Sequence, residues 1–235
     1  MCIICIKKKG VQFPSYDVVK NMCDNNDDGF SLVLSNGKGK PTINKGLNKN
    51  KFLSFYKKVI ASYDYKTTSM FIHARIKTHG TMRIENCHGW KENGLIFAHN
   101  GILSIDNRDD MTDSETFFRD IFSPIYKHCG WKAAKKAIDA VIGTSKFVFM
   151  TNSGDIIHFG NYIEDDGLLY SNTTYKPYTY PRYTGYAGSS YYKSGSGGGY
   201  HWGDTKPISK SVCDDSWIDD YYDNLTDYEK KLYGF

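Results

Sequence analysis

The sequence lacks any apolar run long enough to cross a membrane. It has 235 residues, of which 40% are hydrophobic, and no stretch approaches the ~18 apolar residues of a membrane span. The opening segment, Met1 to Ile6, has neither a basic region nor a long apolar region, so no signal peptide is expected. These absences predict a cytoplasmic protein with no membrane partner.

Cysteine is sparse and has no metal-binding pattern. Six cysteines without a secretory signal favour free thiols over a disulfide framework. Cys2 and Cys5 form a C-x-x-C pair, but they lie in a strand-like run, where positions three apart face opposite sides of a sheet. Cys87-His88 has no well-spaced partner. We therefore expect no metal site and no cofactor.

A phosphate-binding loop is also missing. No G-x-x-x-x-G-K-[ST] segment occurs, which argues against a nucleotide-driven synthase domain. The formal charge of +4 is too small to indicate nucleic acid. Between Gly29 and Tyr63 there are seven lysines and no acid. This segment is either a solvated loop or a basic docking surface, with the acidic stretch 204–231 as one candidate occupant.

Up to about Tyr175, short β-branched and aromatic runs alternate with turn residues. Strands are expected at Ile3–Lys7, Phe30–Leu34, Ser69–Ile76, Leu95–His99, Gly101–Ile105, Lys146–Met150, Ile156–Gly160 and Leu168–Asn172. Helices are expected at Tyr16–Met22, Lys51–Ala61, Ser114–Ile125 and Trp131–Ile142. Strands dominate and helices come in pairs, which indicates sheets covered by helices.

The amino-acid composition changes after Lys176. Residues 177–203 are rich in Tyr, Gly, Ser and Pro and cannot bury enough apolar surface to fold alone. Residues 204–231 carry eight acids and four lysines. We expect a Tyr/Gly/Ser-rich, then acidic, flexible tail over residues 176–235, ending in a short docking helix or a peptide motif.

Cys2 follows the initiator Met directly. Removal of Met1 would leave a thiol and an α-amine on one residue, and an amine with a pKa near ~8 is a suitable base for that thiol. The alternative is a buried strand cysteine, a common place for a free thiol.

Three further polar features each have two interpretations. Arg75 leaves a strand and suits a carboxylate, or it makes a surface ion pair. Asn100-Gly101 has the composition of an oxyanion hole, or it forms a β-turn. Asp113 suits a substrate ammonium, whereas Thr112 and Glu115 around it indicate a capping box.

The order of these features resembles the class II glutamine amidotransferases, which are N-terminal nucleophile hydrolases. The match runs through Cys2, Asp28-Gly29-Phe30, H-x-R-x-x-T-H-G at 73–80, N-x-H at 86–88, A-H-N-G-x-L at 98–103 and T-D-S-E at 112–115. It is closest to the stand-alone branch and covers residues 2–175, the expected amidotransferase domain. Departures are Gly89 for a usual Pro, Trp90 for Phe, Ser31 for Gly and Lys77 for Ala; they bear on the loop over the substrate.

The resemblance implies an α+β fold, the four-layer αββα sandwich. It also implies that Arg75 and Thr78 bind the α-carboxylate of L-glutamine, Asp113 binds the ammonium, and the His79 loop closes over the substrate. Cys2 would form a γ-glutamyl thioester while Asn100 and Gly101 hold the oxyanion.

Ammonia is expected to reach an acceptor on another chain, such as a synthase subunit. The other functions left open are a non-catalytic binding protein with the same fold and an amidohydrolase for another amide. Heavy use of Lys, Asn, Tyr and Asp hints at an AT-rich, viral genome.

Overall fold

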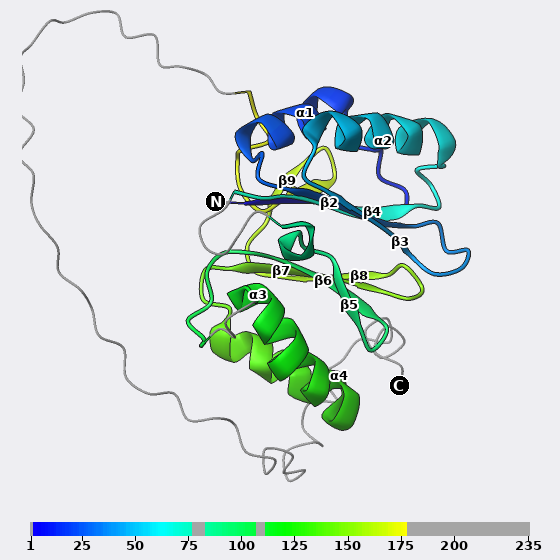
Figure 1. The fold of residues 1–235 in the computed structure, drawn as a ribbon. Coiled ribbons are helices and arrows are strands. Elements are labelled where there is room, and N and C mark those ends of the chain that lie inside the picture. The colour runs from blue at the N-terminus through cyan, green and yellow to red at the C-terminus, as the bar shows by residue number, and fades with distance from the viewer. Residues whose placement is uncertain (1, 77–82, 107–110, 178–235) are drawn as a thin grey trace, which may run out of the picture.

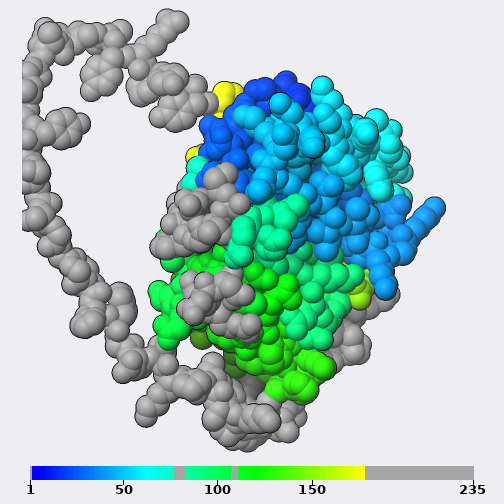
Figure 2. Space-filling model, viewed as in Figure 1, coloured from blue at the N-terminus to red at the C-terminus, as the bar shows by residue number. Residues whose placement is uncertain are grey.

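The computed structural model describes residues 2–76, 83–106 and 111–177. Their order of elements places two sheets between two helical layers, α–β–β–α (Figure 1). In the space-filling view the outer helices lie at opposite ends of the molecule, blue and cyan at one end and green at the other (Figure 2). The expected four-layer αββα sandwich is confirmed.

The larger sheet has six strands in the order β3-β2-β4-β1-β10-β9, and every pair is antiparallel. Its strands are β1 (Ile3–Lys7), β2 (Phe30–Ser35), β3 (Thr42–Gly46), β4 (Ser69–Ala74), β9 (Ile163–Asp165) and β10 (Leu168–Tyr170). Two helices, α1 (Tyr16–Asn25) and α2 (Lys49–Ser62), cover its outer face (Figure 1).

The smaller sheet has four antiparallel strands in the order β5-β6-β7-β8. They are β5 (Trp90–Glu92), β6 (Leu95–Asn100), β7 (Lys146–Thr151) and β8 (Ile156–Phe159). Its outer face is covered by α3 (Asp113–Thr116), the π-helical η2 (Phe117–Phe122) and α4 (Ser123–Val141) (Figure 1). A short 3₁₀ turn, η1 (Ile84–Asn86), precedes β5.

Strand alternation divides the apolar side chains among three cores. In β1, Ile3 and Cys5 face the α1–α2 layer, whereas Ile4 and Ile6 face the second sheet. This is the two-residue period of a strand that is buried on both sides. Trp131, Ala134 and Ile138 of α4 share the face that packs on the smaller sheet, as the helical spacing predicts.

Several expected elements differ from the structure. Residues 101–105 form no strand, since Gly101 turns the chain away at the end of β6. The helix expected over 114–125 is divided into α3, η2 and the first turn of α4, and α4 itself is kinked at Gly130, where φ is +77°. Strands β3, β5 and β9 were not predicted.

The cysteines follow the expectation of free thiols only in part. Cys2, Cys5, Cys23 and Cys87 are free, whereas Cys129 is disulfide-bonded. No helix in the described part of the chain is long and apolar enough to cross a membrane.

Candidate active site

The two sheets bring the ends of three strands together. Ile3 pairs with Ala74 in the antiparallel β1–β4 ladder, so Cys2 and Arg75 leave their strands side by side. Asn100 ends β6 in the other sheet, and its side chain bonds to Ser171, whose hydroxyl also holds Ile4 of β1. Residues far apart in the sequence thus meet at one end of the sandwich.

Cys2 is held through its backbone and is half-buried. The Asn172 side-chain amide donates to the Cys2 carbonyl oxygen at 2.7 Å, and the thiol lies 3.5 Å from the Ile76 carbonyl oxygen. Burial raises the pKa of the Cys2 thiol, and a backbone hydrogen bond with Ile76 and the charge of Arg75 only partly oppose this. The thiol is therefore protonated at neutral pH and needs a base to become a nucleophile.

Arg75 is buried at 4% exposure, so most of its side chain lies away from the surface. Its backbone is fixed to the turn before β2: Arg75 N donates to Gly29 O at 2.8 Å, and Asp28 N donates to Arg75 O at 3.0 Å. Gly29 has φ +151°, and a Cβ there would lie 2.7 Å from Cys87 Sγ. The Asp-Gly-aromatic turn therefore requires glycine to approach this site.

Asn100 and Gly101 do not form a hairpin turn, because β6 pairs with β7 only after a long excursion through the helices. Asn100 is 2% exposed and its Nδ2 lies 2.7 Å from Ser171 Oγ. Gly101 has φ +151°, and a Cβ would stand 2.1 Å from Ser145 Oγ. The pair is therefore a tightly packed strand end.

Asp113 begins α3 and ties it to the loop after Gly101. Its carboxylate accepts from Leu103 N at 2.8 Å and from Ser114 N at 2.7 Å. The Thr112 hydroxyl caps the helix by accepting from Glu115 N, but Glu115 bonds to Arg119. Only one of the two hydrogen bonds of a capping box is therefore present. Asp113 itself fixes the loop after Gly101 to the start of α3.

Two expected substrate ligands, Thr78 and His79, lie outside the described residues. Within the described ranges, no three His, Cys, Asp or Glu side chains are grouped to hold a metal ion.

Two residues at the site were not singled out by sequence reasoning. Ser171 and Asn172 follow β10 and bond to Asn100 and to the backbone of Ile4 and Cys2. Both are small polar residues after a short strand, so the sequence offers no pattern to distinguish them from any loop.

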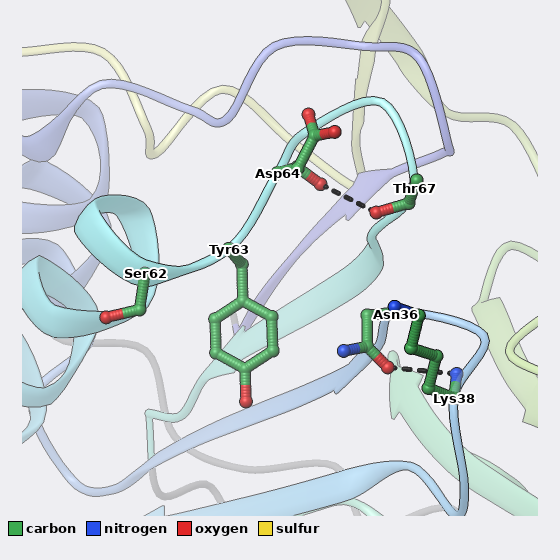
Figure 3. Close-up of a pocket in the computed structure, with 6 residues that line it drawn as sticks. All are labelled: Asn36, Lys38, Ser62, Tyr63, Asp64 and Thr67. Carbon is green, nitrogen blue, oxygen red and sulfur yellow. Dashed lines mark hydrogen bonds between the residues drawn. The ribbon is translucent and has the colours of Figure 1, made fainter.

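A separate surface pocket lies at the opposite end of the larger sheet (Figure 3). It has a volume of about 590 Å³ and lies between the β2–β3 turn and the loop after α2. Its lining residues are Asn36, Lys38, Ser62, Tyr63, Asp64 and Thr67. Asn36 follows Ser35, which pairs with Ser69 at the far end of β4 from Arg75, so this pocket is not part of the candidate active site.

The αββα sandwich thus places a cysteine, an arginine and an asparagine at the ends of three strands. The family described as glutamine amidotransferases class-II matches residues 1–154, and the chain belongs to this family. A curated relative, "Putative glutamine amidotransferase" of Haemophilus influenzae, is 34% identical over 97 residues, which are 39% of this chain and 31% of the relative.

Solved structures give more distant similarities. Glutamine phosphoribosylpyrophosphate amidotransferase from B. subtilis, complexed with ADP and GMP, is 18% identical, with 73% of this chain and 42% of that chain covered and a TM-score of 0.48. A class-II glutamine aminotransferase domain protein from Silicibacter pomeroyi is 16% identical, with 70% and 78% covered and a TM-score of 0.41. The match thus spans under half the length of the curated relative and of the B. subtilis enzyme.

Proposed function

We propose that this protein hydrolyses the side-chain amide of L-glutamine to glutamate and ammonia. The observation that carries the proposal is the meeting of Cys2, Arg75 and Asn100 at the ends of β1, β4 and β6. Membership of the class-II family supports it. The proposed unit is residues 2–175, with 176–235 as an appended tail, and it uses neither metal nor cofactor.

The nucleophile is the Cys2 thiol after removal of Met1. Because burial raises the pKa of this thiol, the new α-amine takes its proton as sulfur attacks the amide carbon. The amine then gives that proton to the departing ammonia, leaving a γ-glutamyl thioester. Water, deprotonated by the same amine, attacks the thioester and releases glutamate and the thiol.

Asn100 and the Gly101 N–H stabilise the oxyanion that develops in both steps. Arg75 and Thr78 bind the α-carboxylate, Asp113 binds the α-ammonium, and His79 belongs to the loop that closes over the substrate. Opposite charges at the two α-groups select a free amino acid over a peptide-linked one.

The ammonia passes to an acceptor carried by another chain, a synthase subunit. A reducing compartment such as the cytoplasm would keep the Cys2 thiol available, although a disulfide such as that of Cys129 is rare there. The B. subtilis structure is named for a phosphoribosylpyrophosphate acceptor; the acceptor here is to be identified by adding candidate subunits to the assay.

The test measures ammonia and glutamate released from L-glutamine by full-length protein whose N-terminus is checked by intact mass. We expect activity only in protein without Met1, and none in Cys2→Ala. Cys23→Ala is the matched control, because Cys23 is a buried free thiol in α1. Hydrolysis of asparagine or an acyl amide, with none of glutamine, would indicate another amidohydrolase. No hydrolysis by processed protein with candidate partners would indicate a binding protein.

A further inference from the structure

The segment after β10 returns to the start of β1 and meets Asn100 there. Ser171 N donates to Ile4 O at 2.9 Å, and Ile4 N donates back to Ser171 Oγ at 2.8 Å. The same Oγ lies 2.7 Å from Asn100 Nδ2. Ser171 is buried at 4% exposure and lies beyond residue 154, where the family match ends.

The donors and acceptors around Ser171 are not all paired in this arrangement. Its hydroxyl accepts from both Ile4 N and Asn100 Nδ2, so the hydroxyl proton has no acceptor among the described residues. At the other end of the amide, Asn100 Oδ1 is buried without a hydrogen-bond partner among them. One unused donor and one unused acceptor thus lie within a few ångströms of each other, and both are costly when buried.

A half-turn of the Asn100 amide pairs these two groups with each other and leaves Nδ2 at the buried position of Oδ1, where a substrate oxygen would be its partner. The amide oxygen and nitrogen are nearly equal in size, so the turn places Oδ1 against the Ser171 hydroxyl. The Ser171 proton then has its acceptor, and Ile4 N keeps its own bond to Oγ. The separation of 2.7 Å is also the usual length of an O–H···O bond, whereas N–H···O bonds centre on about 2.9–3.0 Å.

We propose that Ser171 is a positioning residue that holds the Asn100 amide with its oxygen on the Ser171 hydroxyl and its nitrogen free. The inference rests on the proposed function, in which Nδ2 donates to the developing oxyanion. In this orientation neither Nδ2 hydrogen is used by Ser171. The donor is therefore oriented before the reaction begins, as effective oxyanion stabilisation requires.

The Ser171 hydroxyl is itself fixed by β1. Ile4, which donates to it, is two residues from Cys2, and Asn172 holds the Cys2 carbonyl oxygen at 2.7 Å. The nucleophile and the oxyanion donor are thus both fixed by residues 171 and 172. A small displacement of residues 171 and 172 would therefore move the Cys2 thiol relative to the Asn100 amide. Such a displacement is enough to lower the rate of a reaction that depends on their relative position.

Kinetics of full-length variants test this role. We expect Ser171→Ala to lower kcat for glutamine about ten- to a hundredfold and to leave KM within about twofold, because an unfixed amide stabilises only the transition state less well. Ser171→Thr, which keeps the hydroxyl, should recover part of kcat. Ser69→Ala is the matched control: Ser69 is buried and bonds to Gly154 O at the other end of the sheet.

A double variant separates positioning from general loss of structure. Asn100→Ala alone should lower kcat about 10²–10³-fold. If Ser171 acts through Asn100, then adding Ser171→Ala to Asn100→Ala lowers kcat no further. Multiplicative losses, or a Ser171→Ala effect confined to KM or to thermal stability, would overturn the proposal.

A spectroscopic measurement makes the test independent of activity. The side-chain amide signal of Asn100, assigned by its loss in Asn100→Ala, should shift in Ser171→Ala and stay in place in Ser69→Ala. A protected Ser171 hydroxyl proton should be present only in protein with Asn100. An unshifted amide signal overturns the inference even if the wild type hydrolyses glutamine, and an inactive wild type with a shifted signal rejects the proposed function alone.

Discussion

The imidazole ring of His73 lies flat on the ring of His88, with centroids 3.8 Å apart and planes 9° apart. His88 Nδ1 accepts from His99 N at 3.1 Å, and His99 Nδ1 lies 2.7 Å from Ser114 Oγ. All three rings are buried. A face-to-face stack directs its ring nitrogens sideways, so among the described residues these rings do not converge on a metal ion.

This stack predicts acid sensitivity. Burial, with the charges around it, lowers the pKa of His73 to about 3, and burial lowers the pKa of His99 to about 4. In the unfolded chain both pKa values are near ~6.5. The stability is therefore complete above about pH 6.5 and falls as the pH drops towards 4, because only the unfolded chain binds protons there. Urea unfolding between pH 7 and 5 should show a loss of up to ~1.4 kcal/mol per pH unit for each histidine.

His73→Phe tests the origin of this slope. Phenylalanine keeps the ring against His88 and removes one titrating group, so the free energy of unfolding should depend on pH less steeply, by up to ~1.4 kcal/mol per pH unit. His128→Phe on α4 is the control, because His128 is exposed and lies outside the stack. An unchanged slope in His73→Phe would show that groups other than His73 cause the acid sensitivity.

Gly101 should not tolerate a side chain. An alanine Cβ would stand 2.1 Å from Ser145 Oγ and 2.9 Å from His99 Nε2, at a φ of +151°. We expect Gly101→Ala to lower the free energy of unfolding by about 3 kcal/mol or more, measured by urea unfolding.

Two variants distinguish crowding from backbone strain at this position. Gly37 has φ +75° with nothing within 4 Å of a Cβ, so Gly37→Ala should cost only about 1–2 kcal/mol. Ser145→Gly combined with Gly101→Ala should recover part of the loss, since it removes the two nearest atoms. Equal costs for Gly101→Ala and Gly37→Ala would mean that Ser145 moves aside freely.

Gly89 marks a local departure from the family pattern. Its φ is +93° and its N–H donates to Phe97 O at 2.9 Å at the start of β5. Proline, usual at this place in the family pattern, has neither that φ nor an N–H, so Gly89→Pro should cost about 3 kcal/mol or more in thermal or urea unfolding. Gly89→Ala, which keeps the N–H, should cost about 1–2 kcal/mol. A neutral Gly89→Pro would show that the chain before β5 readily adopts another path.

Sequence patterns predicted the long, regular elements well. The short apolar run of β1 and the spacing of Trp131, Ala134 and Ile138 are local signals, and the strand and the helix that they predict were confirmed. The Asn-Gly pair shows where local signals fail. At Asn93-Gly94 it forms the β5–β6 hairpin with φ values of +47° and +82°, whereas at Asn100-Gly101 it ends a strand because Ser171 and Ser145 pack against it.

Sequence motifs indicated only some of the residues that meet at the candidate site. Arg75 and Asn100 belong to ordered motifs, and the structure brings them to the end of β1 beside Cys2. Ser171 and Asn172 come close to Cys2 and Asn100 only because β10 pairs with β1. This pairing joins segments that are separated by most of the chain, so no local sequence pattern predicts it. The strands β5 and β9, of three residues each, are too short to show a period and depend on pairing with their neighbours.

Asp113→Asn should separate the two tasks of that carboxylate. Asp113 accepts from Leu103 N and Ser114 N, so the amide should cost about 1–2 kcal/mol of stability by placing a donor against a donor. If Asp113 also binds the α-ammonium, KM for glutamine should rise at least tenfold, while KM for 4-carbamoylbutanoate, which lacks the amine, should not change. Glu115→Gln is the control, since it removes a charge paired with Arg119 in the same helical segment. Steady-state kinetics with both substrates test whether Asp113 binds the ammonium. Equal losses of kcat/KM for glutamine and its deamino analogue would mean that Asp113 only anchors the loop.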